Sequence, residues 1–282
     1  MGKFFTSLAP LSSFLHRDLN LNYNPMRLTF LGTGTSQGVP MLACHCRVCT
    51  SPDPRDRRFR SSVWVEDENL SVVIDSSPDF RSQALRAAIP RLDAVIYTHS
   101  HADHIAGFDD LRTYSVKNGN RIPIYADPYT LSRLHKAFDY AFDFHHRNAA
   151  YVCPEPHRIE GPFKIGSVTF VPLPVPHGGI TTTGFRLDRD GSPRAVYLPD
   201  CSAVPPDIRN LIRNIPILII DGLRDEPHPT HLTIAEAMEV AHDVQAKRTW
   251  LTHLTHLTLH AEREALLPPD VRLAYDGLQL DL

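Results

Sequence analysis

Short apolar runs rich in β-branched residues recur along the chain, and turn residues separate them. Runs of this kind are typical of strands buried on both faces. The runs that predict strands are Leu28–Leu31, Ser62–Val65, Ser71–Ile74, Ala94–Tyr97, Val168–Val171, Ala195–Leu198, Ile217–Ile220 and Thr249–Thr252. Apolar residues at helical spacing predict helices over Phe80–Ala88, Ile105–Val116, Thr130–Phe142, Pro206–Asn214 and Thr233–Ala246. The mixture of the two patterns predicts an α/β chain.

The folded domain is expected to start near Arg27, where the sequence changes character. The run Leu28–Leu31 stops at Gly32-Thr-Gly-Thr-Ser-Gln-Gly38, a segment typical of a turn. A chain of 282 residues can form one large α/β domain. We therefore predict a single domain over residues 26–282 and an extension over residues 1–25. A targeting role for the extension stays open, because no acidic residue precedes Asp18.

Charge and cysteine content narrow the class of protein. The formal net charge is -3, so no global charge draws the chain to nucleic acid or to an acidic membrane surface. No apolar run approaches the roughly 18 residues of a transmembrane helix, so no membrane partner is expected. Three of the five cysteines crowd into Cys44, Cys46 and Cys49. This layout is poor for disulfides and favours a reducing compartment such as the cytoplasm.

Residue types that bind metals follow the predicted strands. Because ligand sites in α/β sheets gather beyond the carboxyl ends of strands, side chains at these positions can meet at one edge. The densest segment is Thr98-His-Ser-His-Ala-Asp-His104, where His99 and His101 point the same way if the chain is extended. Further residues at strand ends are Asp75, His177, Asp200 and His253. A single histidine is more often structural, but this many in matching positions predict a metal site.

This order of residues resembles the metallo-β-lactamase-fold hydrolases over essentially the whole chain from about Met26. The resemblance implies an αβ/βα sandwich, in which helices flank two facing mixed sheets. It also implies two catalytic divalent metals, which can be zinc or manganese. One metal would be held by His99, His101 and His177, the second by Asp103, His104 and His253, and both by a bridging Asp200. Asp75 is expected to orient one of the metal ligands by a hydrogen bond and not to bind metal itself.

A second metal site is predicted at Cys44-His-Cys46-Arg-Val-Cys49. These three thiolates have the spacing of a zinc knuckle, but structural zinc normally takes four ligands. The fourth ligand could be His256, or His45 if it can reach the same ion. The alternative interpretation is that the three thiols are buried or merely reduced and bind no metal. We assign the isolated Cys153 and Cys201 to packing.

The cysteine cluster also resembles a subgroup, the phosphoribosyl 1,2-cyclic phosphate phosphodiesterases of phosphonate breakdown. The start Leu31 to Ser36 and the tripeptide Gly38-Val39-Pro40 match that subgroup as well. The resemblance implies that His256 is the fourth ligand of a structural zinc. It further implies a phosphodiesterase that cleaves a small cyclic phosphodiester or nucleotide-like ester, and it suggests a homodimer.

Cleavage of a phosphodiester expels an alkoxide, so a proton donor opposite the nucleophile is expected. Histidine suits this role near neutral pH. His231, in Pro229-Thr-His-Leu-Thr233, matches the subgroup's catalytic histidine, and we predict that it acts as general acid beside Asp200. His228 is a weaker rival. The basic residues Arg55, Arg57, Arg58 and Arg60 could hold a phosphate or an RNA end, but a solvated loop is favoured.

Other functions of the same fold stay open at this point. The fold also hosts thioesterases, lactonases and tRNA 3′-processing nucleases, so it does not decide the reaction alone. A different class is the oxygenase-type chemistry of the pyrroloquinoline-quinone biosynthesis protein, which carries a similar cysteine cluster. A non-catalytic zinc protein is a third class. Nucleic acid is expected at most as a substrate end.

Overall fold

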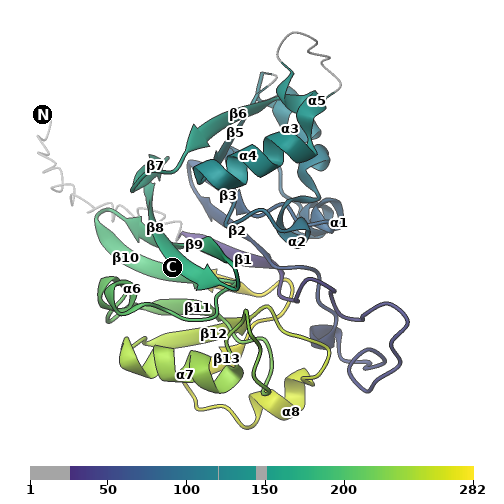
Figure 1. Cartoon of the computed structure of the whole chain (residues 1–282), viewed down its shortest axis with the longest axis vertical. Helices are drawn as coiled ribbons and strands as arrows, with labels where there is room; N and C mark the ends of the chain where they lie inside the picture. Colours follow the sequence, from purple (N-terminus) through teal and green to yellow (C-terminus); the bar gives the residue numbers. More distant parts are fainter. Residues whose placement is uncertain (1–25, 120, 144–150) are drawn as a thin grey trace, which may run out of the picture.

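Two seven-stranded sheets face each other in the computed structural model, which describes residues 26–119, 121–143 and 151–282 (Figure 1). The predicted extension of residues 1–25 lies outside the described residues. The first sheet has the order β14-β1-β2-β3-β4-β5-β6. Its strands are β1 (Arg27–Gly32), β2 (Ser62–Asp67), β3 (Leu70–Ile74), β4 (Ala94–Ile96), β5 (Ile122–Ala126), β6 (Pro154–Arg158) and β14 (Gln279–Asp281).

The second sheet has the order β13-β12-β11-β10-β9-β8-β7. Its strands are β7 (Phe163–Ile165), β8 (Val168–His177), β9 (Ile180–Arg189), β10 (Ser192–Leu198), β11 (Ile217–Asp221), β12 (Arg248–Thr252) and β13 (Val271–Leu273). Strands β3 to β6 run parallel to one another, and so do β10 to β13. Their carboxyl ends therefore carry loops that can meet at one edge of the sandwich.

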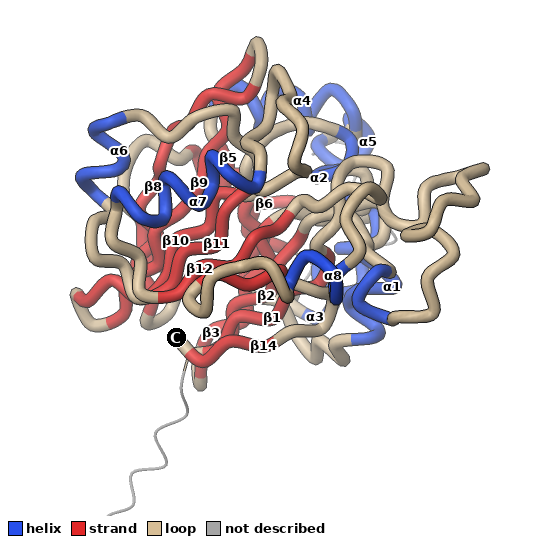
Figure 2. Tube along the Cα trace, turned by 90° about the horizontal axis from the view of Figure 1, so that it is seen from below, coloured by secondary structure: helices blue, strands red, loops and turns tan. Residues whose placement is uncertain are grey.

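Helices cover the outer faces of both sheets, as Figures 1 and 2 show. They are α1 (Phe80–Arg86), α2 (Ala102–Ile105), α3 (Arg112–Lys117), α4 (Pro128–Ala137), α5 (Asp139–Phe142), α6 (Pro206–Leu211), α7 (Ile234–Asp243) and α8 (His260–Glu264). Two 3-10 turns, η1 (Pro54–Asp56) and η2 (Phe108–Leu111), lie in connections. No helix of the described residues is long and apolar enough to cross a membrane.

Three apolar layers hold the sandwich together. The central layer lies between the sheets and includes the buried Phe30, Val72, Tyr197 and Ile219. A second layer packs α6 and α7 on the outer face of the second sheet, and a third packs α1, α3 and α4 on the first. Burial of these apolar surfaces is the main force that stabilises the fold. The predicted αβ/βα sandwich is confirmed.

The structure differs from the predicted elements where local rules compete. The helix predicted over Ile105–Val116 is three short pieces, α2, η2 and α3, and the break lies at Gly107. A Cβ atom there would come within 2.1 Å of the Ser77 carbonyl oxygen, so this close approach requires glycine.

Strand β8 is longer than predicted because it tolerates the prolines that interrupt its apolar pattern. Pro172, Pro174 and Pro176 alternate along the strand, so their missing N–H groups all lie on one side. The neighbour β7 pairs only with Val168–Phe170, and that side of β8 therefore needs no donors beyond this point. The strand continues to His177, which brings this histidine to the edge of the sheet.

Candidate metal centre

Seven histidine and aspartate side chains predicted to bind metal come together at one edge of the sandwich. His99 and His101 follow β4, and Asp103 and His104 lie on α2. The others end or follow strands of the second sheet: His177 on β8, Asp200 after β10 and His253 after β12. The structure arranges them as two groups whose ligand atoms lie within 4.8 Å of one another, namely His99, His101 and His177, and Asp103, His104, Asp200 and His253.

The carboxylate of Asp200 lies between the two groups. Its Oδ2 is 4.0 Å from Nε2 of His99 and 4.0 Å from Nε2 of His177. Its Oδ1 is 3.4 Å from Nε2 of His104 and 3.2 Å from Nδ1 of His253. One oxygen therefore faces each group, which is the arrangement that a carboxylate shared by two cations requires.

Buried polar atoms without a hydrogen bond test whether metal ions fit this centre. Both Nε2 of His104 and Oδ1 of Asp200 are buried, and neither has a hydrogen-bond partner among the described residues. Unsatisfied buried polar atoms are rare and call for a specific partner. Imidazole nitrogens and carboxylate oxygens are the donor types that zinc and manganese take. The donor set therefore fits a pair of divalent cations.

Hydrogen bonds from behind fix the orientation of several rings. Nδ1 of His104 lies 2.7 Å from Oδ2 of Asp75, and Nδ1 of His177 donates to the Thr230 carbonyl oxygen at 2.7 Å. Asp75 is fully buried, has a left-handed φ of 67° and accepts a hydrogen bond from the Thr98 backbone N–H at 2.8 Å. These contacts leave Nε2 of His104 and Nε2 of His177 free to bind a metal ion. The contact between Asp75 and His104 is the one expected of a residue that orients a metal ligand without binding the metal itself.

The electrostatics of the cluster favour ionised carboxylates and neutral rings for His99, His177 and His253. The exception is His104: burial lowers its pKa, but the carboxylates of Asp200, Asp103 and Asp75 around it outweigh burial and raise this pKa well above its ordinary value. Burial lowers the pKa of His99 and His177, and it lowers the pKa of His253 to about 4. Burial alone would raise the pKa of Asp200, but the histidines around it hold this pKa well below its ordinary value. Neutral imidazole and carboxylate are the protonation states that bind metals.

His231 and Asp221 form a hydrogen-bonded pair next to the cluster. Nδ1 of His231 lies 2.7 Å from Oδ2 of Asp221, which also accepts the backbone N–H of Cys201 at 3.1 Å. The His231 ring centroid is 4.7 Å from that of His177 and 4.8 Å from that of His253. Asp221 was not among the predicted site residues, although an acidic residue directly after the apolar run Ile217–Ile220 is a signal that could have revealed it.

A cavity of about 370 Å³ opens beside these groups. Besides ligand candidates it is lined by Ser36, Gly178, Gly179, Ile180, His228, Thr230 and His231. Ile180 carries the only apolar side chain among these residues beyond the methyl group of Thr230. The cavity is therefore small and polar, and it suits a small substrate with many oxygen atoms.

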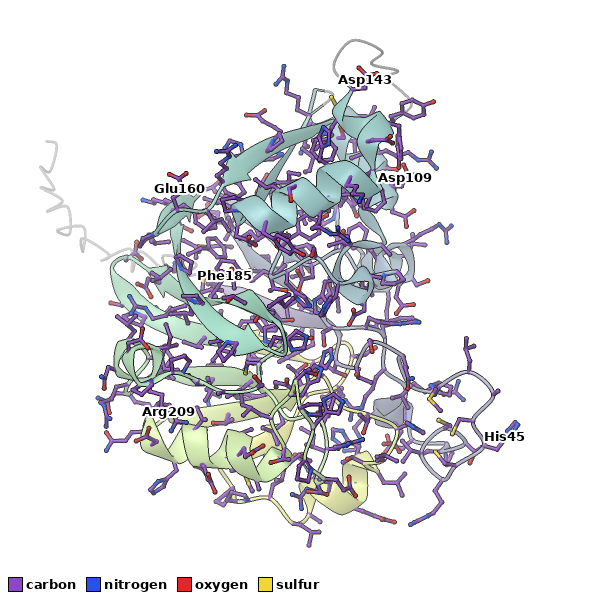
Figure 3. The ribbon with its side chains drawn as sticks, in the orientation of Figure 1. His45, Asp109, Asp143, Glu160, Phe185 and Arg209 are labelled. Carbon is purple, nitrogen blue, oxygen red and sulfur yellow. The ribbon has the colours of Figure 1, made fainter. Side chains whose placement is uncertain are left out.

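The predicted cysteine cluster also assembles. The Sγ atoms of Cys44, Cys46 and Cys49 lie 3.3, 3.4 and 3.6 Å from Nδ1 of His256. These residues form a Cys3His group, and four such donors fit a structural zinc. His45, the other candidate for fourth ligand, is outside this group, and Figure 3 shows it at the tip of the loop, pointing away from the body of the molecule.

The prediction of a solvated loop holds for only part of the arginine block, which consists of Arg55, Arg57, Arg58 and Arg60. Arg55 pairs with Asp53 at 2.7 Å and Arg57 is exposed. Arg58, in contrast, is buried and donates to Thr33 Oγ1 at 2.8 Å and to the Ala274 carbonyl oxygen at 2.6 Å. The arginine block is therefore partly a structural feature of the domain, and Arg58 is not available to a phosphate.

Comparison with known proteins identifies the family. The Beta-lactamase superfamily domain matches residues 71–254. The chain belongs to the metallo-β-lactamase superfamily. Together with the buried histidine and aspartate cluster, this membership makes the protein a metal-dependent hydrolase by fold and site.

Individual relatives of this superfamily protein differ in their names. The crystal structure of a new diphosphatase from the PhnP family is 41% identical in sequence, with a TM-score of 0.84, and the match covers 91% of this chain and 98% of that one. An octanoyltransferase of Porphyromonas gingivalis is 35% identical over 264 residues and matches 90% of this chain. The chain spans about half of that relative, 51% of its length. Coenzyme PQQ synthesis protein B of Xanthomonas campestris pv. campestris is 29% identical over 70% of this chain and 73% of its own.

Proposed function

We propose that this protein is a binuclear metal-dependent phosphodiesterase that hydrolyses a small cyclic phosphodiester or nucleotide-like ester. The observation that carries the proposal is the position of Asp200, whose two carboxylate oxygens face two separate groups of ligand candidates. Two divalent cations bound there would supply Lewis acidity, favouring attack by hydroxide and offsetting charge on the phosphoryl oxygens.

The ligand assignment follows the two groups. His99, His101 and His177 would hold one cation, Asp103, His104 and His253 the other, and Asp200 both. Zinc and manganese suit this donor set equally. A separate structural zinc would be held by Cys44, Cys46, Cys49 and His256.

His231 would act as the general acid for the leaving group. Asp221 holds its Nδ1, so the proton for transfer is carried on Nε2, and His231 is one of the residues that line the cavity. Burial lowers the pKa of His231, but the hydrogen bond to Asp221 and the charges of Asp200 and Asp103 outweigh it and raise this pKa. A positioned acid of this kind accelerates ester cleavage by about 10²–10⁴-fold.

The shape and polarity of the cavity support a phosphorus ester over an acyl ester. Its lining offers no apolar channel for the acyl chain of a thioester, since Ile180 is the one large apolar side chain among the lining residues. The 41% identical structure is that of a diphosphatase, and this similarity also favours attack at phosphorus. The octanoyltransferase name belongs to a relative about twice as long, and the polar cavity argues against an octanoyl substrate for this chain.

A hydrolysis screen tests the proposal. The purified protein is loaded with zinc or with manganese and assayed on bis(p-nitrophenyl) phosphate, cyclic phosphodiesters, a precursor tRNA, a thioester and a lactone. We expect metal-dependent turnover of small phosphodiesters. Turnover of the thioester or lactone with none of any phosphodiester would overturn the substrate class, and preference for precursor tRNA would favour the nuclease alternative.

A further inference from the structure

A proline-rich segment, residues 224–231, forms an arm over the cavity and is tied down at both ends. The backbone N–H of Leu223 donates to the carbonyl oxygen of Leu232 at 3.0 Å, which closes the base of the arm. Within it, the Arg224 guanidinium donates to the carbonyl oxygens of Glu226 at 3.2 Å and Pro227 at 3.1 Å. The arm is therefore a fixed part of the cavity wall.

Thr230 fastens this arm to a ligand candidate. Its carbonyl oxygen accepts the hydrogen bond from Nδ1 of His177. Gly178, which follows His177 in the sequence, lies close to Thr230: a Cβ atom at Gly178 would come within 2.7 Å of Thr230 Cγ2. The φ angle of Gly178 is +58°. The arm and the end of β8 thus hold each other in place.

The hydrogen bonds of His228 define which of its ring nitrogens carries the proton. The backbone N–H of Thr230 points to Nδ1 at 3.4 Å, and the Thr230 hydroxyl lies 3.1 Å from the same atom. Because a nitrogen that accepts an N–H bears no proton in a neutral ring, the proton is on Nε2. No partner for this Nε2–H is found among the described residues.

The surroundings of His228 keep its ring neutral. Burial lowers the pKa of His228, and the nearby His231 and Arg224 lower it further. Its ring centroid lies 5.1 Å from that of His231, and both rings line the cavity. A neutral ring that offers one N–H beside the general acid can serve as a donor to the substrate.

We infer that His228 is a specificity-determining residue that donates from Nε2 to an acceptor oxygen on the leaving group. The inference rests on the proposed function, in which His231 protonates the leaving ester oxygen. The two rings are adjacent, so the ester oxygen that His231 protonates and the oxygen that accepts from His228 lie close together. Both oxygens therefore belong to the same small leaving group. His228 therefore selects polyol-type leaving groups, which carry a further hydroxyl near the ester oxygen, over purely hydrocarbon ones.

Two matched esters test this role. Glycerol 1,2-cyclic phosphate and propane-1,2-diol cyclic phosphate contain the same ring and both expel an alkoxide, but only the first carries an additional hydroxyl. Ring opening is followed by phosphorus-31 NMR in the metal-loaded protein, with bis(p-nitrophenyl) phosphate as a reference for activity. We expect the wild type to prefer the glycerol ester and His228→Phe to reduce that preference in kcat/KM by about tenfold, as loss of one hydrogen bond implies.

Two further variants separate recognition from structure. His228→Gln retains an N–H donor and should restore most of the preference, while His242→Gln, an exposed histidine on α7, should leave it unchanged. An equal loss on both esters in His228→Phe, or a loss of bound metal, would show that His228 only supports the arm and would overturn the inference.

The wild type separates this inference from the proposed function. Turnover of bis(p-nitrophenyl) phosphate without preference for the glycerol ester refutes the role of His228 alone. No turnover of any phosphodiester refutes the proposed function itself.

Discussion

The candidate metal centre and the Cys3His group are both clusters of metal-ligand residues, but the protein builds them in opposite ways. The centre takes its side chains from strand ends in two sheets, and most of these side chains are buried. The Cys3His group takes three residues from one irregular loop, and all four members are only half-buried. The packed core positions the side chains of the candidate metal centre. The Cys3His group has little apolar burial of its own, so its arrangement depends on the bonds that its four side chains would make to a metal ion.

One segment connects the two clusters. His253 belongs to the metal centre and His256 to the Cys3His group, and Leu254 lies between them. The Leu254 N–H donates to the Thr33 carbonyl oxygen at 2.9 Å, and its carbonyl oxygen accepts the Thr35 N–H at 3.1 Å. These bonds hold the segment in the core, so changes in the loop should reach the centre only weakly.

The largest expected effect comes from removing an exposed member of the buried centre. His101→Ala should lower kcat/KM for a phosphodiester by about 10³-fold, because the charge stabilisation that a metal gives to the transition state is weakened. Since His101 is exposed, the thermal midpoint should change little. Steady-state kinetics with metal analysis measures this, and full activity in the variant would contradict the ligand assignment.

Asp221→Asn tests the positioning of the general acid. The amide cannot hold the His231 ring in the same protonation state, so kcat should fall by about 10²-fold. The loss should be larger for an ester with an alkoxide leaving group than for bis(p-nitrophenyl) phosphate, which needs less protonation. Equal losses on both esters would mean that Asp221 supports the fold and not proton transfer.

Asp75→Asn tests the support behind the centre. Its bond to His104 Nδ1 orients that ring, and loss of such a contact weakens metal affinity by about 10–100-fold. Calorimetric metal titration should show weaker binding at the group that contains His104. Unchanged affinity would show that packing alone fixes the ring.

Cys46→Ser sharpens the contrast between the two clusters. We expect loss of the structural zinc and a thermal midpoint lower by about 5 °C, while the catalytic metals stay bound. Cys153→Ser is the matched control, since Cys153 lies outside both groups. If the Cys46 variant also lost the catalytic metals, the two clusters would be one cooperative unit.

Much of the centre could be predicted because it depends on local rules. Apolar runs such as Ser71–Ile74 and Ile217–Ile220 define strands, and ligand residues follow strands at fixed positions. Strands with prolines or alternating polar residues, such as β6 and β9, escaped prediction. Strand β6 lies at the edge of the first sheet and contains two prolines, and β9 contains three consecutive threonines and a glycine, so neither forms an apolar run.

The sequence by itself determined the α/β class, the candidate ligands and the cysteine cluster, because spacing along a strand or loop sets where side chains point. The sandwich was implied by the resemblance of these residues to a known family. The resemblance already implied that Asp200 bridges two ligand groups, and the tertiary structure supplied the distances. Only the tertiary structure decided that Asp221 holds His231 and that Arg58 is buried. The His228–Thr230 contact is local, yet its meaning depends on the cavity beside it. These relations join residues that are remote in sequence, and the packing of two sheets, which no local pattern encodes, brings them together.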